Sequence, residues 1–275
     1  GGTAHRAAMA PALAATALTL LLGLQPVLTD LYLPALPLLA RELDAPMSAT
    51  QLTMSALILA FGLSQLVWGP VADRFGRRPV LLASLSLLVL ASIGASFAPH
   101  IGWLIAGRAA QGATMAAAVV CARAMVRDLY EPHQGARVMS HALSGLGLLA
   151  IGSPLLGGAL AMALGWRSTL AAVAIFSALV LLYIWFALPE TLRARNPRAL
   201  HLPSLAANAG SVLRHPTFLA WALLIAATYG GLFTLLAASS FAYIEVLGLT
   251  PAQYGLAMAS GSLAYMVGTF YCRRW

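Results

Sequence analysis

The sequence predicts an all-α membrane protein built as a bundle of long apolar helices. Hydrophobic residues make up 60% of its 275 residues and charged residues only 9%, whereas a soluble domain carries about 25% charged residues. Eight apolar runs are each long enough to cross a bilayer, whose hydrocarbon core takes about 20 apolar residues in a helix. Backbone groups in lipid must be satisfied within a segment, and these runs are too long for barrel strands.

The apolar runs place the predicted spans at residues 10–36, 50–72, 79–98, 101–126, 136–163, 167–188, 216–243 and 251–272. One longer stretch, residues 190–215, follows the sixth span. In that stretch apolar residues recur at helical spacing: Leu202, Leu205, Ala209, Val212 and Leu213. We therefore expect part of it to form an amphipathic helix on the membrane surface.

The formal net charge of +8 comes from arginines scattered over short segments. With the N-terminus in the cytoplasm, the outer segments hold only Arg41 and Arg167, and the inner segments hold most of the others. Such a bias predicts a cytoplasmic N-terminus. The scatter also argues against a nucleic-acid-binding protein, because the sequence has no basic stripe and no nucleic-acid module.

The first span contains an acidic residue, Asp30, within the stretch from Thr29 to Pro37. A charge in the middle of a membrane costs about 2.5 to 3.5 kcal/mol on insertion scales, and intramembrane ionisable residues are therefore functional candidates. This cost favours the neutral carboxyl group. Asp30 is thus the candidate group for binding and releasing a proton.

A short charged loop separates the second span from the third, and it contains Gly69, Asp73, Arg74, Gly76, Arg77 and Arg78. Gly69 is expected to let two helix backbones approach, and Gly76 to take a positive φ in the turn. Asp73 ends a helix whose dipole disfavours a carboxylate, so it needs a partner such as Arg77 or the N-terminal amides of another helix. On a simpler interpretation, the arginines only keep the loop in the cytoplasm.

The fourth span contains Arg108, followed by Gln111 and Gly112. An ionisable residue inside a span is a functional candidate, and a nearby arginine would favour the charged form of Asp30. Alternatively, Arg108 donates hydrogen bonds to carbonyl groups at a helix contact and takes no part in proton transfer. Both interpretations stay open on the sequence alone.

The fifth span is rich in small residues around a proline, and the relevant positions are Gly152, Ser153, Pro154, Gly157 and Gly158. Small residues allow close contact between helices, and a proline bends the helix and frees a carbonyl group. This pattern predicts a tightly packed, bent helix.

The first and seventh spans offer aromatic residues rather than charges, namely Tyr32, Tyr229 and Phe233. Aromatic residues in spans more often serve packing or the membrane interface than a ligand. If they line a cavity, an apolar site with few charges suits small lipophilic or uncharged compounds.

Several classes of catalytic site are missing from the sequence. It contains no His-Glu-x-x-His, no Gly-x-Ser-x-Gly and no phosphate-binding loop. Its histidines and cysteines lack metal or redox spacing. We therefore expect neither an enzyme nor a cofactor or metal site, and a proton gradient is the expected source of energy.

The loop Gly69-x-x-x-Asp-Arg-x-Gly-Arg-Arg between the second and third spans resembles the signature loop of the major facilitator superfamily of transporters. Four further stretches resemble, in order, the bicyclomycin and chloramphenicol resistance branch of its drug:proton antiporters. They are Thr29-Asp-Leu-Tyr-Leu-Pro-Ala-Leu-Pro37, Arg108-x-x-Gln-Gly112, Ser153-Pro-Leu-Leu-Gly-Gly158 and Pro189-Glu-Thr-Leu192. Ser153 departs from the glycine of the antiporter motif in the fifth span.

The resemblance implies a major facilitator fold with twelve spans in two six-helix halves. Residues 1–189 would be the N-terminal half, residues 190–215 a cytoplasmic linker, and residues 216–275 an incomplete C-terminal half with helices 7 and 8. The chain would thus hold eight of twelve spans.

The resemblance also implies a function: a monomeric secondary transporter of the bacterial inner membrane that exports drugs or metabolites in exchange for protons. Asp30 would bind the proton, Arg108 would modulate its binding, and the Asp73 loop would latch the cytoplasmic side. One alternative is a proton-coupled nutrient symporter of the same fold. Another is a truncated product that transports nothing.

Overall fold

Long helices form at all eight predicted span positions in the computed structural model, which describes residues 10–192 and 194–272. They are α1 (Pro11–Asp30), α3 (Met47–Phe75), α4 (Arg77–Ser96), α5 (Ile101–Leu129), α6 (Pro132–Leu164), α7 (Trp166–Ala187), α9 (Pro216–Phe241) and α10 (Pro251–Cys272). Within the described ranges, seven helical segments are long and apolar enough to cross a membrane. The eighth helix, α10, has sufficient length at 22 residues, but it is not among the seven.

The first predicted span is not one continuous helix. After α1 ends at Asp30, a 3₁₀ turn covers Leu33–Ala35, and a short helix, α2, covers Leu36–Glu42. Pro34 has no N–H to donate and disfavours helical geometry in the residue before it, so the α-helical hydrogen bonds stop at this point. The regular α-helix is therefore interrupted immediately beyond Asp30, although Leu31 and Tyr32 keep right-handed helical backbone angles.

The seventh span also ends irregularly. A π-helical turn, η2 (Ala242–Val246), continues α9, and Gly248 then takes a φ of 73° before α10 begins. Between α3 and α4, Gly76 has a φ of 107°, which confirms the expected left-handed turn residue. Only one residue separates these two helices, so a side chain with a Cβ would be strained there.

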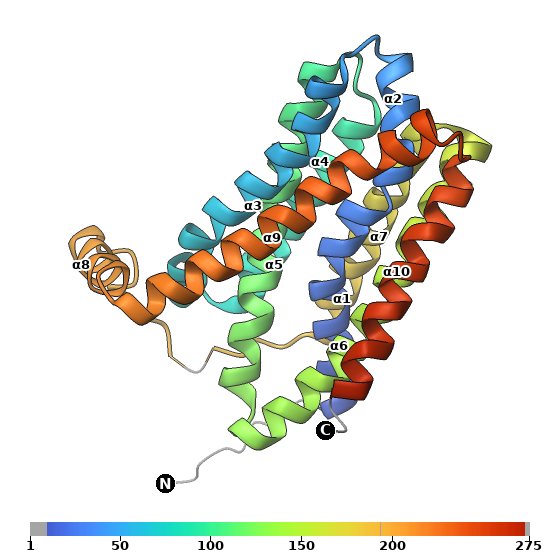
Figure 1. Cartoon of the computed structure of the whole chain (residues 1–275). Helices are drawn as coiled ribbons and strands as arrows, with labels where there is room; N and C mark the ends of the chain where they lie inside the picture. The colour runs from blue at the N-terminus through green and yellow to red at the C-terminus, as the bar shows by residue number, and fades with distance from the viewer. Residues whose placement is uncertain (1–9, 193, 273–275) are drawn as a thin grey trace, which may run out of the picture.

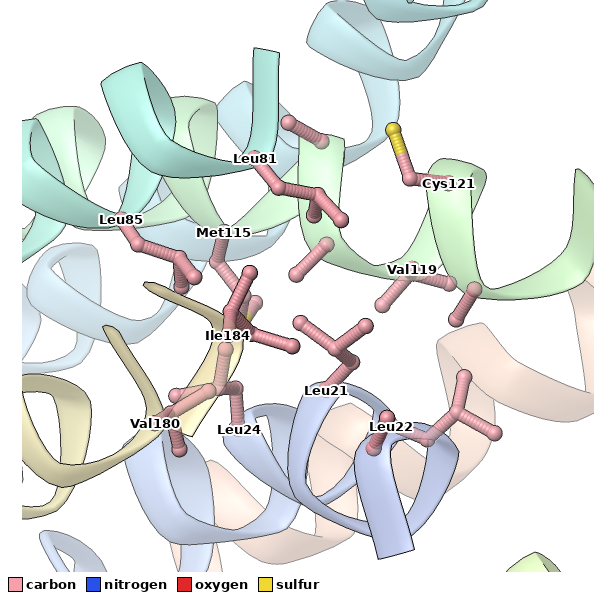
Figure 2. Close-up of a cluster of buried hydrophobic side chains, with 14 of the residues drawn as sticks. Leu21, Leu22, Leu24, Leu81, Leu85, Met115, Val119, Cys121, Val180 and Ile184 are labelled. Carbon is pink, nitrogen blue, oxygen red and sulfur yellow. The ribbon is translucent and has the colours of Figure 1, made fainter. Parts of the chain in front are cut away.

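The core lies among α1, α4, α5 and α7. Figure 2 shows Leu21 and Leu24 of α1 close to Leu85 of α4 and to Val180 and Ile184 of α7, all of them buried. Cys121 is buried in the same cluster, where it packs as a small apolar residue. Dispersion between closely packed side chains holds these helices together, because lipid tails are as apolar as leucine and give no hydrophobic drive for helix association.

Two helices stand apart from this core. In Figure 1, α9 runs obliquely across the bundle, and α8 (Leu202–Leu213) lies to one side near the beginning of α9. Most residues of α9 are exposed along its length, and α9 meets α2 and α3 only near its far end. The expected helix in the stretch 190–215 is confirmed by α8.

Helices α3 and α5 form the most extensive contact in the bundle, and Gly112 lies where their backbones approach most closely. A Cβ added at Gly112 would overlap the carbonyl oxygen of Leu57. A larger residue must therefore push the two helices apart.

We expect Gly112→Ala to destabilise the protein by about 1–3 kcal/mol, the usual cost of overpacking. Gly94→Ala is the matched control, because nothing lies within 4 Å of a Cβ at this helical position and alanine favours helices over glycine. Thermal unfolding of the purified protein in detergent measures both. An equal melting temperature for the two variants would refute the close contact.

Candidate functional site

Arg108 lies at the centre of a buried polar cluster that joins four helices. Its guanidinium group is fully buried and donates a hydrogen bond of 2.8 Å to the carbonyl oxygen of Leu28 and one of 3.0 Å to Oε1 of Gln111. The guanidinium carbon lies 4.2 Å from the centre of the Tyr32 ring. Arg108 therefore binds residues on both sides of the break after α1.

The break in α1 explains why an arginine fits here. The carbonyl groups in the last turn of a helix lack intrahelical partners and carry partial negative charge, which favours a cation. Leu28 belongs to that last turn. The face of the Tyr32 ring adds a second attraction, the cation–π interaction.

Neighbouring polar groups keep this cluster in place. The Tyr32 hydroxyl group lies 2.9 Å from Oγ1 of Thr53, and Thr53 donates its own proton to the carbonyl of Thr50 over 2.6 Å. Tyr32 is therefore the donor in its bond to Thr53. Gln111 donates to Oγ of Ser92 over 2.9 Å, which connects α5 to α4.

Asp30 ends α1 between the two residues that Arg108 binds. Its carboxylate is half-buried and accepts a hydrogen bond of 2.8 Å from the hydroxyl group of Thr29. Among residues 10–192 and 194–272, the ion pairs do not include Asp30. The structure thus does not bring Asp30 and Arg108 into an ion pair. The hydrogen bond from Arg108 to a backbone carbonyl agrees with the second interpretation given above, in which Arg108 binds carbonyl groups at a helix contact.

A second cluster forms at the Asp73 loop. Arg77, itself buried, pairs with Oδ1 of Asp73 at 2.7 Å and with Oδ2 of Asp128 at 3.1 Å. The prediction that Asp73 has a compensating partner is confirmed, and that partner is Arg77. Because Asp128 lies at the end of α5, one guanidinium group links the ends of α3, α4 and α5.

Glu190 completes this second cluster from the far end of α7. Its carboxylate accepts hydrogen bonds from the backbone N–H groups of Arg77 and Arg78, at 3.0 and 3.3 Å. A carboxylate at a helix N-terminus satisfies unpaired donors and interacts favourably with the dipole. In return, Arg78 donates to the carbonyl of Trp185 in α7 over 2.9 Å. The beginning of α4 and the end of α7 therefore hold each other.

Two other residues of the loop behave differently. The Arg74 guanidinium carbon lies 5.6 Å from the centre of the neighbouring Phe75 ring, and Arg74 is exposed. Gly69 was expected to allow close helix approach, but nothing lies within 4 Å of a Cβ at this position. That prediction is wrong in this structure, because α3 faces open space at Gly69 rather than another helix backbone.

The small residues of α6 serve close packing in part. A Cβ at Gly157 would overlap the carbonyl oxygen of Leu31, and one at Gly158 the carbonyl oxygen of Pro251. Gly255 of α10 faces the carbonyl of Pro154 in the same way. These contacts confirm the expected tight packing, whereas Gly152 faces open space.

At the other positions of this motif, Pro154 lies inside α6, and Ser153 donates to the carbonyl of Leu149 over 2.6 Å. The motif as a whole therefore seats α6 against the broken end of α1 and against the beginning of α10.

The three aromatic candidates do not form one site. Tyr32 is fully buried in the Arg108 cluster. Tyr229 and Phe233 pack against each other on α9 with ring centres 6.3 Å apart, and Tyr229 is 52% exposed. A cavity of about 860 Å³ lies elsewhere, between the end of α5, the beginning of α6, and Leu192 and Ala194.

The opposite end of the bundle also has ion pairs. Arg41 of α2 binds both carboxylate oxygens of Glu245 in η2 at 2.8 Å. Glu42 accepts a bond of 2.8 Å from the Trp166 indole and lies 3.5 Å from Arg167. The short helix α2 therefore joins α7 on one side and the end of α9 on the other.

Sequence reasoning missed Asp128 and Glu190 as partners of the loop. The sequence did contain an indication. The chain has only eight acidic residues, and an acidic residue at the end of an apolar run needs a positively charged or hydrogen-bonding partner. Within the described part of the chain, no cluster of His, Cys, Asp and Glu residues that could hold a metal ion occurs.

Removal of the Glu190 carboxylate should weaken the junction of α4 and α7. We expect Glu190→Ala to lower stability by about 1–2 kcal/mol, because two N–H groups lose their acceptor, and Glu190→Gln to recover part of the loss. Glu131→Ala is the matched control, since Glu131 precedes α6 without a capping bond from its side chain. The melting temperatures of the variants in detergent measure these effects. An equal decrease in melting temperature for Glu190→Ala and Glu131→Ala would contradict the capping role.

Comparison with known proteins gives three similarities. A family model described as Major Facilitator Superfamily matches residues 12–275. An uncharacterized MFS-type transporter of Bacillus subtilis is 30% identical over 265 residues, which cover 94% of this chain and 66% of that protein. A bicyclomycin resistance protein homolog of Haemophilus influenzae is 29% identical over 232 residues, covering 84% of this chain and 58% of that one. The chain thus spans less than two thirds of the length of these relatives.

Among solved structures, the chain is similar to a bacterial homolog of the human lysosomal transporter Spinster in an inward-facing and unoccupied conformation. The TM-score is 0.72 at 18% sequence identity, over 98% of this chain and 62% of that one. At this level of identity the likeness concerns the fold alone.

Proposed function

The chain belongs to the Major Facilitator Superfamily, and from this premise we propose that it serves a drug:proton antiporter that exports small lipophilic or uncharged compounds. The family consists of multi-pass membrane transporters and not of enzymes. In this proposal residues 1–189 are the first six-helix half, residues 190–215 the linker, and residues 216–275 part of the second half. The N-terminus and the Asp73 loop face the cytoplasm of a bacterial cell, and the protein acts as a monomer.

Two observations support export rather than another kind of transport. The relative in Haemophilus influenzae is named for resistance to bicyclomycin. The sequence also contains five motifs in the order typical of the bicyclomycin and chloramphenicol resistance branch.

The observation that carries proton coupling is the position of Asp30. It lies at the broken end of α1, where a carboxylate is unfavourable beside the partial negative charge of the helix end. Arg108 binds Leu28 and Tyr32, the residues two positions before and after Asp30. We propose that loss of a proton from Asp30 changes the charge at the break, and that Arg108 responds from the other side of the same break.

The Asp73 cluster would act as the latch of the cycle. Arg77 ties α3, α4 and α5 together through Asp73 and Asp128, and Glu190 adds the end of α7. Asp73, Arg77 and Asp128 lie at helix ends, and Glu190 follows the end of α7, so the cluster holds the ends of four helices together. It therefore suits control of the conformational change rather than recognition of substrate.

Asp30→Asn should abolish proton-driven export and leave membrane insertion intact, because the amide cannot exchange a proton. Export of a fluorescent lipophilic dye from vesicles with an imposed pH gradient measures the effect in the complete protein. Asp44→Asn is the matched control, since Asp44 is exposed in the turn after α2. Unchanged dye export by the Asp30 variant would disprove the assignment.

Asp73→Ala should slow the transport cycle several-fold while substrate affinity stays near its normal value. The reason is that Asp73 pairs with Arg77 at the end of α3, where the pair joins helices that must move during the cycle. Turnover and substrate binding are measured separately on the same reconstituted protein. A large loss of affinity at a normal cycling rate would count against the latch.

Two alternatives have their own signatures. A proton-coupled nutrient symporter of the same fold would accumulate its substrate inside vesicles that have an acidic exterior, instead of expelling it. A truncated product would show no transport in either direction, although it inserts into the membrane. The vesicle assay with the Asp30 variant as a blank separates export, uptake and inactivity.

A further inference from the structure

The helix α8 has an apolar side that is exposed in the part of the chain that the structure describes. On a helical wheel, Ala209, Val212 and Leu213 fall on this side, whereas Ala207 and Ser211 fall on the opposite side. On the apolar side, Val212 is 45% exposed and Leu213 is 57% exposed. The main contact of α8 in the described part of the protein is with α9.

The position of α8 along the chain fixes its depth. The helix ends at Leu213, and α9, which is long and apolar enough to span a membrane, begins at Pro216. Only Arg214 and His215 lie between them. Because a residue extends at most about 3.6 Å, the C-terminal end of α8 must lie close to the level where α9 enters the bilayer.

The beginning of the segment is fixed at the same end of the bundle. Glu190 binds the N-terminus of α4, and the backbone N–H of Asn196 donates to the carbonyl of Asp73 over 3.0 Å. Figure 1 shows α8 at this end, beside the bundle rather than inside it, with its axis turned away from that of α9. A membrane surface is therefore the surface that the exposed apolar side meets.

The charge of this segment favours one kind of membrane. Between Glu190 and Glu245 the sequence has no acidic residue, and it has four arginines. Arg195, Arg198 and Arg214 are exposed and take part in none of the ion pairs that join described residues. Basic residues next to a membrane are attracted to anionic lipid headgroups.

We propose that α8 is an interfacial helix that binds anionic phospholipid: its apolar side inserts among the acyl chains while Arg195, Arg198 and Arg214 bind the headgroups. This site is separate from the Arg108 and Asp73 clusters, and it does not depend on export as the activity. Burial of the apolar side among the acyl chains drives insertion of α8, and the charge of the arginines causes the preference for anionic lipid.

Spin labels on opposite sides of α8 test the proposal in the full chain. Ala209→Cys marks the apolar side and Ala207→Cys the polar side, in a background in which Cys121 and Cys272 are replaced by alanine. The protein is reconstituted in vesicles of phosphatidylcholine alone or with phosphatidylglycerol. Relaxation by oxygen, which concentrates in lipid, and by a water-soluble nickel chelate gives the depth of each label.

With phosphatidylglycerol present, we expect the label at position 209 to be accessible to oxygen and protected from nickel, and the label at position 207 to show the reverse. Replacing Arg195, Arg198 and Arg214 by glutamine should shift the label at 209 towards water and remove the difference between the two lipids. Each arginine near an anionic surface changes partitioning about fivefold. Arg137→Gln is the matched control, because Arg137 is exposed on α6 and takes part in none of the ion pairs that join described residues, and it should leave the depth of both labels unchanged.

Three outcomes would overturn the proposal. Equal nickel accessibility of both labels would mean that α8 lies in water. Protection of the label at 209 from both oxygen and nickel would mean that protein covers the apolar side. Insertion to the same depth in both lipids, unchanged by the glutamine variants, would mean that the arginines bind no headgroups.

Discussion

The rest of the structure depends on how the buried charge of Arg108 is satisfied. A guanidinium group in an apolar core is costly unless hydrogen bonds and polarisable groups surround it. Here a carbonyl at the end of α1, the ring of Tyr32 and the amide of Gln111 do so. Because α1 ends at Asp30, the carbonyl of Leu28 is in its last turn and can accept from Arg108, so the end of α1 and the position of α5 depend on each other.

The two ends of the bundle are joined in different ways. At the end with Asp73, the polar contacts of Arg77 and Glu190 connect α3, α4, α5 and α7, all of which precede α8. At the other end, Arg41 connects α2 to η2, which follows α9. Near this same end, Gly158 and Gly255 bring α6 and the beginning of α10 into backbone contact. Both of these attachments of the helices after α8 thus lie towards the end that carries Arg41.

Sequence patterns were sufficient for features that depend on one segment. Apolar length located all eight helices, the spacing of Leu205, Ala209 and Val212 located α8, and the turn at Gly76 followed from its single-residue connection. The interruption at Pro34 has a local cause as well. It was not predicted, because the apolar run continues through the proline. Contacts between distant segments were not predictable in this way. Nothing near Glu190 indicates that it caps α4, and nothing near Gly69 indicates that α3 faces open space there.

The two-residue connection between α8 and α9 has a mechanical consequence. So short a connection has no slack, and a tilt of α9 during any conformational change must therefore move α8 along the membrane surface. During that motion α8 is subject to the lateral pressure and viscosity of one leaflet. The bilayer would then resist the conformational change mechanically, and the rate of the change would depend on lipid viscosity.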